Sequence, residues 1–134
     1  MELKNYYDVL IIGGGIGGLM AAHRLTENDP SLQVCLVEQG NPLEHRKCPI
    51  VAGQTNRCVR CKSCAIMEGI GGAGAFSDGK YVISTEYGGW LTDFLPREVV
   101  LEYIEQADRI LVSHGATTER YTPNNELKKL CLQY

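Results

Sequence analysis

The sequence lacks any long hydrophobic run. Its longest uncharged apolar stretch, from Val9 to Ala22, is shorter than the ~20 apolar residues that a membrane-spanning helix needs, and it is rich in glycine. The first residues, Met1 to Lys4, do not have the cationic start of a signal peptide. We therefore expect a soluble, cytoplasmic protein that makes no contact with a membrane.

The sequence also lacks an excess of positive charge. Its 13 Lys and Arg residues are outnumbered by 16 Asp and Glu residues, and no basic stripe stands out along the chain. Nucleic acid is therefore not an expected partner. The length of 134 residues suits one domain, and the apolar content is sufficient to bury a core.

One stretch near the start organises the rest of the chain. A run of aliphatic residues from Asp8 to Ile12 predicts a strand and leads directly into a glycine-rich turn, Gly13 to Gly18. The segment from Leu19 to Leu25 predicts a helix, and the apolar run from Val34 to Val37 predicts a second strand that ends on Glu38. This order predicts a βαβ unit, the N-terminal part of an α/β, Rossmann-like domain.

Three glycines in the turn fit the G-x-G-x-x-G pattern of dinucleotide-binding proteins. Gly13 would permit the tight turn, Gly15 would let a pyrophosphate approach the backbone, and Gly18 would let helix and strand pack closely. The anion would then lie at the N-terminus of the helix, where free N–H groups and the helix dipole attract it. The alternative is a glycine-rich turn in another kind of α/β domain.

The acidic residue at the end of the second predicted strand indicates which dinucleotide would bind. Glu38 lies 20 residues after Gly18, where a carboxylate can accept hydrogen bonds from both hydroxyls of an adenosine ribose. A carboxylate at this place would repel the extra phosphate of NADP. The pattern therefore favours NAD or FAD.

The chain contains six cysteines and has no secretion signal, which favours reduced thiols, metal ligands or redox chemistry over a disulfide scaffold. Cys35, in the second predicted strand, and Cys131, in the last predicted helix, fit small apolar packing residues. The other four are clustered with C-x9-C-x2-C-x2-C spacing: Cys48, Cys58, Cys61 and Cys64.

Three interpretations of this cluster stay open. Four thiolates so placed could bind an iron–sulfur cluster or zinc. Alternatively, Cys58 with Cys61, or Cys61 with Cys64, forms a redox-active dithiol, because each is a C-x2-C pair and the neighbouring cations of Arg60 and Lys62 favour the thiolate. The third interpretation is a set of unpaired structural thiols.

A second glycine-rich run follows the cysteines, from Gly69 to Lys80. Its backbone can be approached closely by something flat or anionic, so that its N–H groups could line the second half of a dinucleotide. A flexible linker is the alternative. The candidate cofactor-binding residues here are Gly71, Gly72, Gly74 and Ser77. Arg46, in the charged loop before the cysteines, is a further candidate that could reach a cofactor phosphate, although the pattern favours a solvated basic side chain there.

Taken together, these segments resemble a known family. The stretch from Asp8 to Glu38 looks like the N-terminal βαβ unit of FAD-dependent oxidoreductases of the glutathione-reductase type. The chain is also similar to the bacterial, largely uncharacterised FAD-dependent dehydrogenases. This likeness rests on four segments: the Cys48-Pro49 pair, the triple-cysteine segment, the GGAGAFSDGK run (71–80) and the YGGWL segment (87–91).

The resemblance implies FAD as the cofactor. By this likeness Glu38 would face the adenosine ribose, and the glycines of the first run would face the pyrophosphate: Gly13, Gly15 and Gly18. Those of the second run would lie beside the ribityl chain and the flavin ring: Gly71, Gly72 and Gly74. No settled substrate comes with the family, so the resemblance names the cofactor and not the reaction.

The remaining segments predict a short strand from Tyr81 to Ser84, a helix from Pro96 to His114, and a second helix from Thr122 that still runs at Tyr134. Proteins of the resembled family are much longer. We therefore expect residues 1–134 to be a partial FAD/NAD(P)-binding domain, truncated, with 46–80 as its cysteine-rich and glycine-rich cofactor loop. Its partners would include the rest of the FAD and substrate domains, and its exposed apolar surface would favour self-association.

These observations lead to a hypothesis about function. We expect an FAD-dependent oxidoreductase, a dehydrogenase of unidentified substrate and unidentified catalytic residues, in which the flavin carries the redox chemistry. Its reaction partner would be a small molecule or an electron carrier. The alternative is a non-enzymatic nucleotide- and metal-binding module that acts as a sensor or a scaffold.

Overall fold

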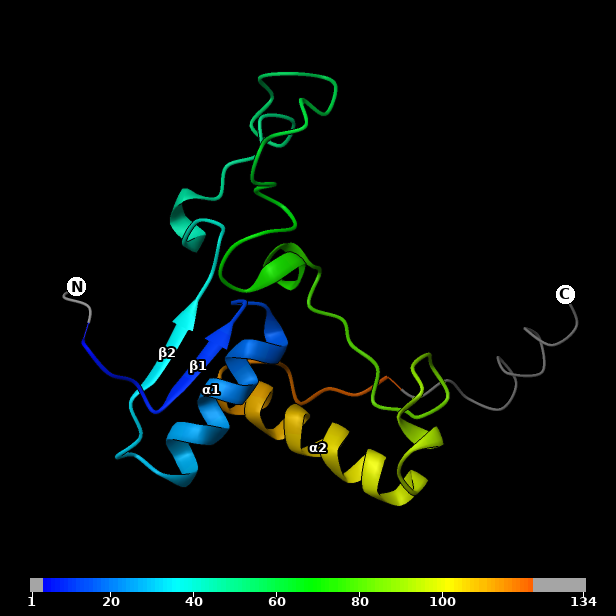
Figure 1. Ribbon diagram of the computed structural model, residues 1–134. Helices are drawn as coiled ribbons and strands as arrows, with labels where there is room; N and C mark the ends of the chain where they lie inside the picture. Colours follow the sequence, from blue (N-terminus) through cyan, green and yellow to red (C-terminus); the bar gives the residue numbers. More distant parts are fainter. Residues whose placement is uncertain (1–3, 122–134) are drawn as a thin grey trace, which may run out of the picture. The chain divides into compact units, whose positions relative to one another are not determined.

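The computed structural model describes residues 4–121 of the chain. The chain divides into two compact units, Met1–Lys80 and Tyr81–Tyr134. The first unit contains strand β1 (Val9–Ile12), helix α1 (Ile16–Asn28) and strand β2 (Val34–Val37), and the second contains helix α2 (Arg97–Ser113) (Figure 1).

The first unit forms the predicted βαβ arrangement. Strands β1 and β2 are parallel neighbours, with Val9 opposite Val34 and Ile12 opposite Val37, and α1 contacts both strands. The start of the pair is held by Asp8, whose N–H donates to the Gln33 carbonyl oxygen at 2.9 Å. The α/β, Rossmann-like fold of this segment is thereby confirmed.

Short 3-10 turns occupy parts of the loops that follow. One turn, Leu43–His45, lies in the charged loop after β2. Another, Gly72–Phe76, lies inside the second glycine-rich run. This run is therefore folded at its centre, unlike an extended linker.

The second unit is built on α2. Its bounds, Arg97–Ser113, confirm the helix predicted from Pro96 to His114; Pro96 is the N-cap, and Gly115, with φ +102°, follows the C-terminus. A further 3-10 turn, Leu91–Asp93, precedes the helix. No helix within residues 4–121 is long and apolar enough to cross a bilayer.

One buried carboxylate holds three segments of the second unit together. Asp108 of α2 is 6% exposed, and its carboxylate accepts a hydrogen bond from the Tyr81 hydroxyl at 2.7 Å and forms an ion pair with Arg120. The Tyr81 hydroxyl and the Arg120 guanidinium lower the pKa of Asp108 below its ordinary value, so the carboxylate is ionised. The same bond to Asp108 raises the pKa of Tyr81.

The strand predicted from Tyr81 to Ser84 is wrong. These residues have no regular structure, because a strand needs a neighbour to hydrogen-bond with, and β1 and β2 are the paired strands among residues 4–121. The helix predicted from Thr122 and the position of Cys131 lie outside the described residues.

Candidate functional site

The turn between β1 and α1 is a sharp strand-to-helix corner, here called the glycine corner (Gly13 to Gly18). Gly13 has φ +104°, a conformation that favours glycine, and its N–H donates to the Val37 carbonyl oxygen of β2 at 2.7 Å. Gly15 is the N-cap of α1, with an extended backbone. The chain therefore leaves the sheet and enters the helix within three residues.

Gly18 lies where α1 crosses β1. A Cβ atom at this position would overlap the Gly13 carbonyl oxygen and lie 3.3 Å from Ile11 Cγ2 of β1. Only glycine fits without a shift of the backbone. This is the close helix–strand approach that the sequence pattern predicts for the third glycine.

The space beside Gly15 is open. A Cβ atom built there would have no atom within 4 Å, and the same is true of Gly17. Since Gly15 has no side chain, it cannot cap the N–H groups of the first turn of α1. These N–H groups and the open space together suit an anion such as a pyrophosphate.

The Glu38 carboxylate faces the glycine corner. Its Oε2 accepts a hydrogen bond from the Gly14 N–H at 2.6 Å, and its Oε1 accepts bonds from the N–H groups of Gly40 at 2.8 Å and Gly69 at 3.0 Å. These bonds, that from Gly14 foremost, lower the pKa of Glu38 below its ordinary value, and the positive charge of Arg46 acts in the same direction. The side chain is thus an ionised acceptor beside the N-terminus of α1.

The second glycine-rich run lies against the first. The Gly71 N–H donates to the Gly14 carbonyl oxygen at 2.8 Å, and a Cβ atom on Gly72 would lie 3.3 Å from Gly15 Cα. Gly74 faces open space, and the Ser77 hydroxyl accepts a bond from the Gly79 N–H at 3.1 Å. The structure therefore brings Gly71 and Gly72 to the glycine corner, whereas Ser77 is engaged in a local turn.

Arg46 is buried, so the favoured expectation of a solvated basic side chain is wrong. Only 4% of the residue is exposed, and each of its three guanidinium nitrogens donates to a carbonyl oxygen: Nε to Ala65 at 2.9 Å, one terminal nitrogen to Ile66 at 2.8 Å and the other to Ile70 at 2.7 Å. The guanidinium also lies 4.7 Å from the centre of the Phe76 ring. The planar fork of arginine suits such multiple contacts, so residues 65–70 fold around it.

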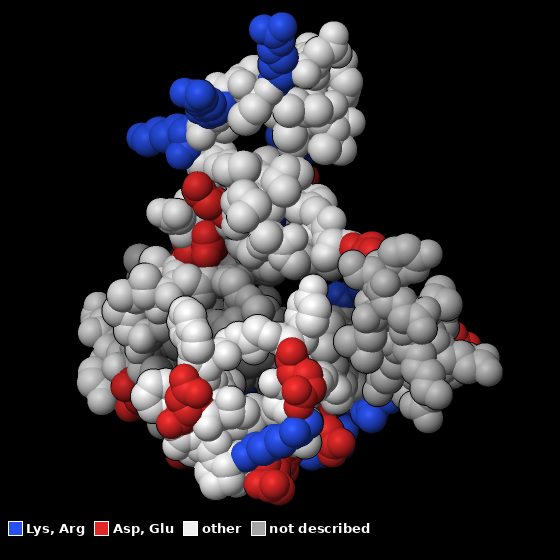
Figure 2. All heavy atoms as spheres, turned by 90° about the vertical axis from the view of Figure 1, so that its right-hand side faces the viewer, with Lys and Arg blue, Asp and Glu red and all other residues white. Residues whose placement is uncertain are grey.

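The cysteine cluster is spread along a loop. Cys58 and Cys61 are exposed, Cys48 and Cys64 are half-buried, and all four are free thiols. Lys and Arg side chains stand on this projecting part of the chain (Figure 2). Within residues 4–121 no group of three or more His, Cys, Asp or Glu side chains is arranged to hold a metal ion. The expected iron–sulfur or zinc site is therefore not formed there, and the metal part of the sensor hypothesis has no support.

One protein family matches the part of the chain that contains the glycine corner. Residues 8–47 match the family described as lycopene cyclase protein, a family that belongs to the FAD-dependent, Rossmann-like superfamily. The match includes the glycine corner, Glu38 and Arg46, and it supports an FAD-dependent function in coarse terms. It ends before Cys48. No curated protein and no solved structure matches the chain.

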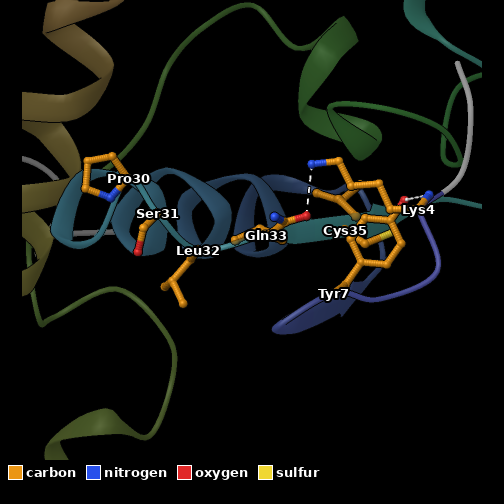
Figure 3. A pocket seen from close by; sticks show the side chains of 9 residues that line it. Lys4, Tyr7, Pro30, Ser31, Leu32, Gln33 and Cys35 are labelled. Carbon is orange, nitrogen blue, oxygen red and sulfur yellow. Dashed lines mark hydrogen bonds between the residues drawn. The ribbon is translucent and has the colours of Figure 1, made fainter.

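A separate hollow of about 450 Å³ lies beside β2 (Figure 3). Its lining comes from Lys4, Tyr7 and residues 30–36. The Lys4 ammonium donates to the Gln33 side chain at 2.9 Å. Cys35 contributes from β2, half-buried as expected for a small packing residue. This hollow holds none of the predicted cofactor-binding residues.

Sequence reasoning missed Gly40 and the structural role of Arg46. The Gly40 N–H donates to Glu38. A Cβ atom on residue 40 would overlap the backbone of Gly69, so the second glycine-rich run can pack this closely only if residue 40 is glycine. A glycine two residues after the acid was the available signal. The structural role of Arg46 had no local signal, because its partners lie about twenty residues further along the chain.

Proposed function

We propose that this chain binds FAD at the glycine corner and belongs to an FAD-dependent oxidoreductase, a dehydrogenase. The observation that carries the proposal is the ionised Glu38 carboxylate held at the Gly14 N–H, next to the open space at Gly15. A ribose acceptor and an anion site are thus adjacent, as the adenosine diphosphate half of FAD requires.

Each half of the cofactor has residues suited to it. The pyrophosphate would lie at Gly15 and the first turn of α1, and the adenosine ribose would donate to Glu38, whose two oxygens offer about four acceptor sites, of which three are used. Gly71, Gly72 and Gly74 would lie along the ribityl chain. When bound, the flavin supplies hydride or electron transfer, while these residues bind and orient it.

The charge of Glu38 sets which nucleotides are accepted. Because the bond from Gly14 lowers its pKa, the carboxylate stays negative at neutral pH. A negative group beside the ribose repels the additional phosphate of NADP. The family match over residues 8–47 supports FAD over NAD.

The test measures the binding of FAD to the 134-residue chain by the quenching of flavin fluorescence. NAD and NADP are added as competitors. Gly15→Ala should weaken FAD binding at least about tenfold, since the new methyl group fills the anion space and a factor of ten is ~1.4 kcal/mol. Gly17→Ala is the matched control, because the motif accepts any residue there and the space is open. Absence of FAD binding to the wild-type chain, or equal loss in both variants, would refute the proposal.

A further inference from the structure

Residues 47–64 form a closed loop, here called the cysteine loop. Arg46, the residue before it, donates hydrogen bonds to the carbonyl oxygens of Ala65 and Ile66, the two residues after it. The two ends of the loop are thereby fastened together at its base. Figure 1 shows the loop projecting beyond the carboxyl ends of β1 and β2.

This closure divides the four cysteines into two pairs. Cys48 and Cys64 lie at the base, within two residues of the Arg46 contacts, and both are half-buried. Cys58 and Cys61 lie further along the loop, and both are exposed. The geometry therefore separates an exposed C-x2-C pair from the two cysteines at the base.

The backbone between the two exposed cysteines contains a left-handed residue. Arg60 has φ +51°, the left-handed conformation that a residue with a side chain rarely adopts, and it is the one non-glycine residue among 4–121 with a positive φ. Cys58 and Cys61 are thus separated by a residue outside the extended conformation.

The cysteine loop is also positively charged. No Asp or Glu occurs between Glu44 and Glu68, although acidic residues outnumber basic ones in the whole chain. The loop itself carries four basic residues: Lys47, Arg57, Arg60 and Lys62. Figure 2 shows Lys and Arg side chains on this projecting segment. Such a local field raises the concentration of anions near the exposed thiols.

We propose that Cys58 and Cys61 form a redox-active dithiol that is oxidised by disulfides carrying negative charge. One thiolate of the pair attacks a sulfur of the disulfide, which forms a mixed disulfide and releases one thiolate of the reagent. The second cysteine then attacks the sulfur of the first, which forms the Cys58–Cys61 bond and releases the other reagent thiolate. Two electrons pass from the cysteine pair to the reagent, and the two thiol protons pass to the solvent.

This site does not depend on the proposed flavin function. Its residues lie outside the glycine corner, and the thiol exchange needs no bound nucleotide. Loss of FAD binding would leave the proposal standing, and loss of thiol exchange would leave the FAD proposal standing.

The test uses two disulfide reagents on the reduced chain. The anionic reagent is dithionitrobenzoate, and the neutral one is dithiodipyridine. The Cys58–Cys61 pair should release two equivalents of reagent thiolate and yield one cross-linked peptide in the mass spectrum of a digest. Cys58→Ser and Cys61→Ser should each release one equivalent from the pair and retain the mixed disulfide. Cys35→Ser, in β2, is the control and should leave the cross-link intact.

The charge of the loop is tested separately. Replacement of Arg57 and Lys62 by Gln should lower the rate with the anionic reagent by about three- to tenfold and leave the rate with the neutral reagent unchanged, as electrostatic steering requires. Added salt should lower the anionic rate in the same way. The proposal would be overturned if the mixed disulfide of the wild-type chain were not converted to the Cys58–Cys61 disulfide. It would also be overturned if the purified chain retained zinc in a fixed molar ratio and Cys58→Ser lost that zinc.

Discussion

Two charged side chains connect the loops around the glycine corner. Glu38 accepts hydrogen bonds from three backbone N–H groups, at Gly14, Gly40 and Gly69, and Arg46 donates to three backbone carbonyl oxygens. Backbone groups that would otherwise be unsatisfied in a loop-rich region are thereby paired. One negative and one positive side chain thus hold these loops together.

At the level of this single carboxylate, pH should control the corner. The pKa of Glu38 is lowered in the folded chain, mainly by the bond from Gly14, so its contribution is fully present above the ordinary glutamate pKa of about 4.3 and is lost as pH falls through the lowered folded value. Amide hydrogen exchange at Gly14, Gly40 and Gly69 should therefore accelerate in acid relative to the rest of the chain.

The variant Glu38→Gln tests both this charge and the proposed ribose contact. It should remove the acid-dependent change in exchange at Gly14 and weaken FAD binding by roughly 10- to 100-fold, because a charge-assisted hydrogen bond is replaced by a weaker one. Unaltered acid dependence at Gly14 in this variant would show that another group titrates there.

Arg46 should contribute to stability more than any exposed arginine does. Arg46→Met leaves three carbonyl oxygens without their donor, and we expect a loss of about 2–3 kcal/mol in the free energy of unfolding, with Arg46→Lys recovering only part of it. Arg24→Lys, at an exposed ion pair with Glu27, is the control and should change the free energy of unfolding by less than about 0.5 kcal/mol. Urea unfolding measures all three variants, and equal losses at Arg46 and Arg24 would contradict the expectation.

At the scale of elements, contiguous patterns were enough to predict β1, α1, β2 and α2. An aliphatic run that enters a glycine turn and an apolar stripe of helical period each lie within one short window of sequence. The strand predicted from Tyr81 to Ser84 failed because a run of suitable residues does not reveal whether a partner strand is near.

The candidate site divides in the same way. Gly13, Gly15, Gly18 and Glu38 could be identified because their spacing along one βαβ unit is fixed by the geometry of the unit. The Gly71 contact with Gly14 and the burial of Arg46 could not, because both depend on how a long loop returns to the sheet. Charge alone suggested that Arg46 meets solvent or phosphate, whereas folding surrounds it with carbonyl oxygens.

The crossing of α1 over β1 gives a paired prediction for neighbouring glycines. Gly18→Ala should destabilise the chain by about 1–3 kcal/mol, because the new methyl group overlaps the Gly13 carbonyl oxygen and the backbone must shift. Gly17→Ala should stabilise it by about 0.5–1 kcal/mol, since the space there is open and alanine favours a helix. Unfolding in urea compares them, and equal effects would mean that α1 and β1 do not approach closely.

At the scale of the whole molecule, much apolar surface meets solvent. Leu10 is 60% and Ile12 is 84% exposed on the same face of β1, and Val37 of β2 is 49% exposed. Val100, at 3% exposed, is the one buried apolar residue of the core in the described part of the chain. Contiguous apolar surface of this kind favours association.

Self-association should therefore be measurable and should involve β1. We expect the mass from sedimentation equilibrium to rise with concentration, and Ile12→Thr to weaken association by about tenfold, as removal of one buried aliphatic side chain would. Val51→Thr is the matched control, because Val51 is 77% exposed but lies on the cysteine loop. An equal effect of both substitutions would exclude β1 as the contact.

The Arg46 contacts at the base of the cysteine loop have a consequence for the tolerance of the chain to insertions. Because the two ends are fastened to each other, the distance between them does not change when residues are added in between, and doubling a flexible loop costs only about 0.6 kcal/mol. A foreign peptide or an affinity tag grafted beside Gly53 should therefore be displayed on the surface without displacing the glycine corner.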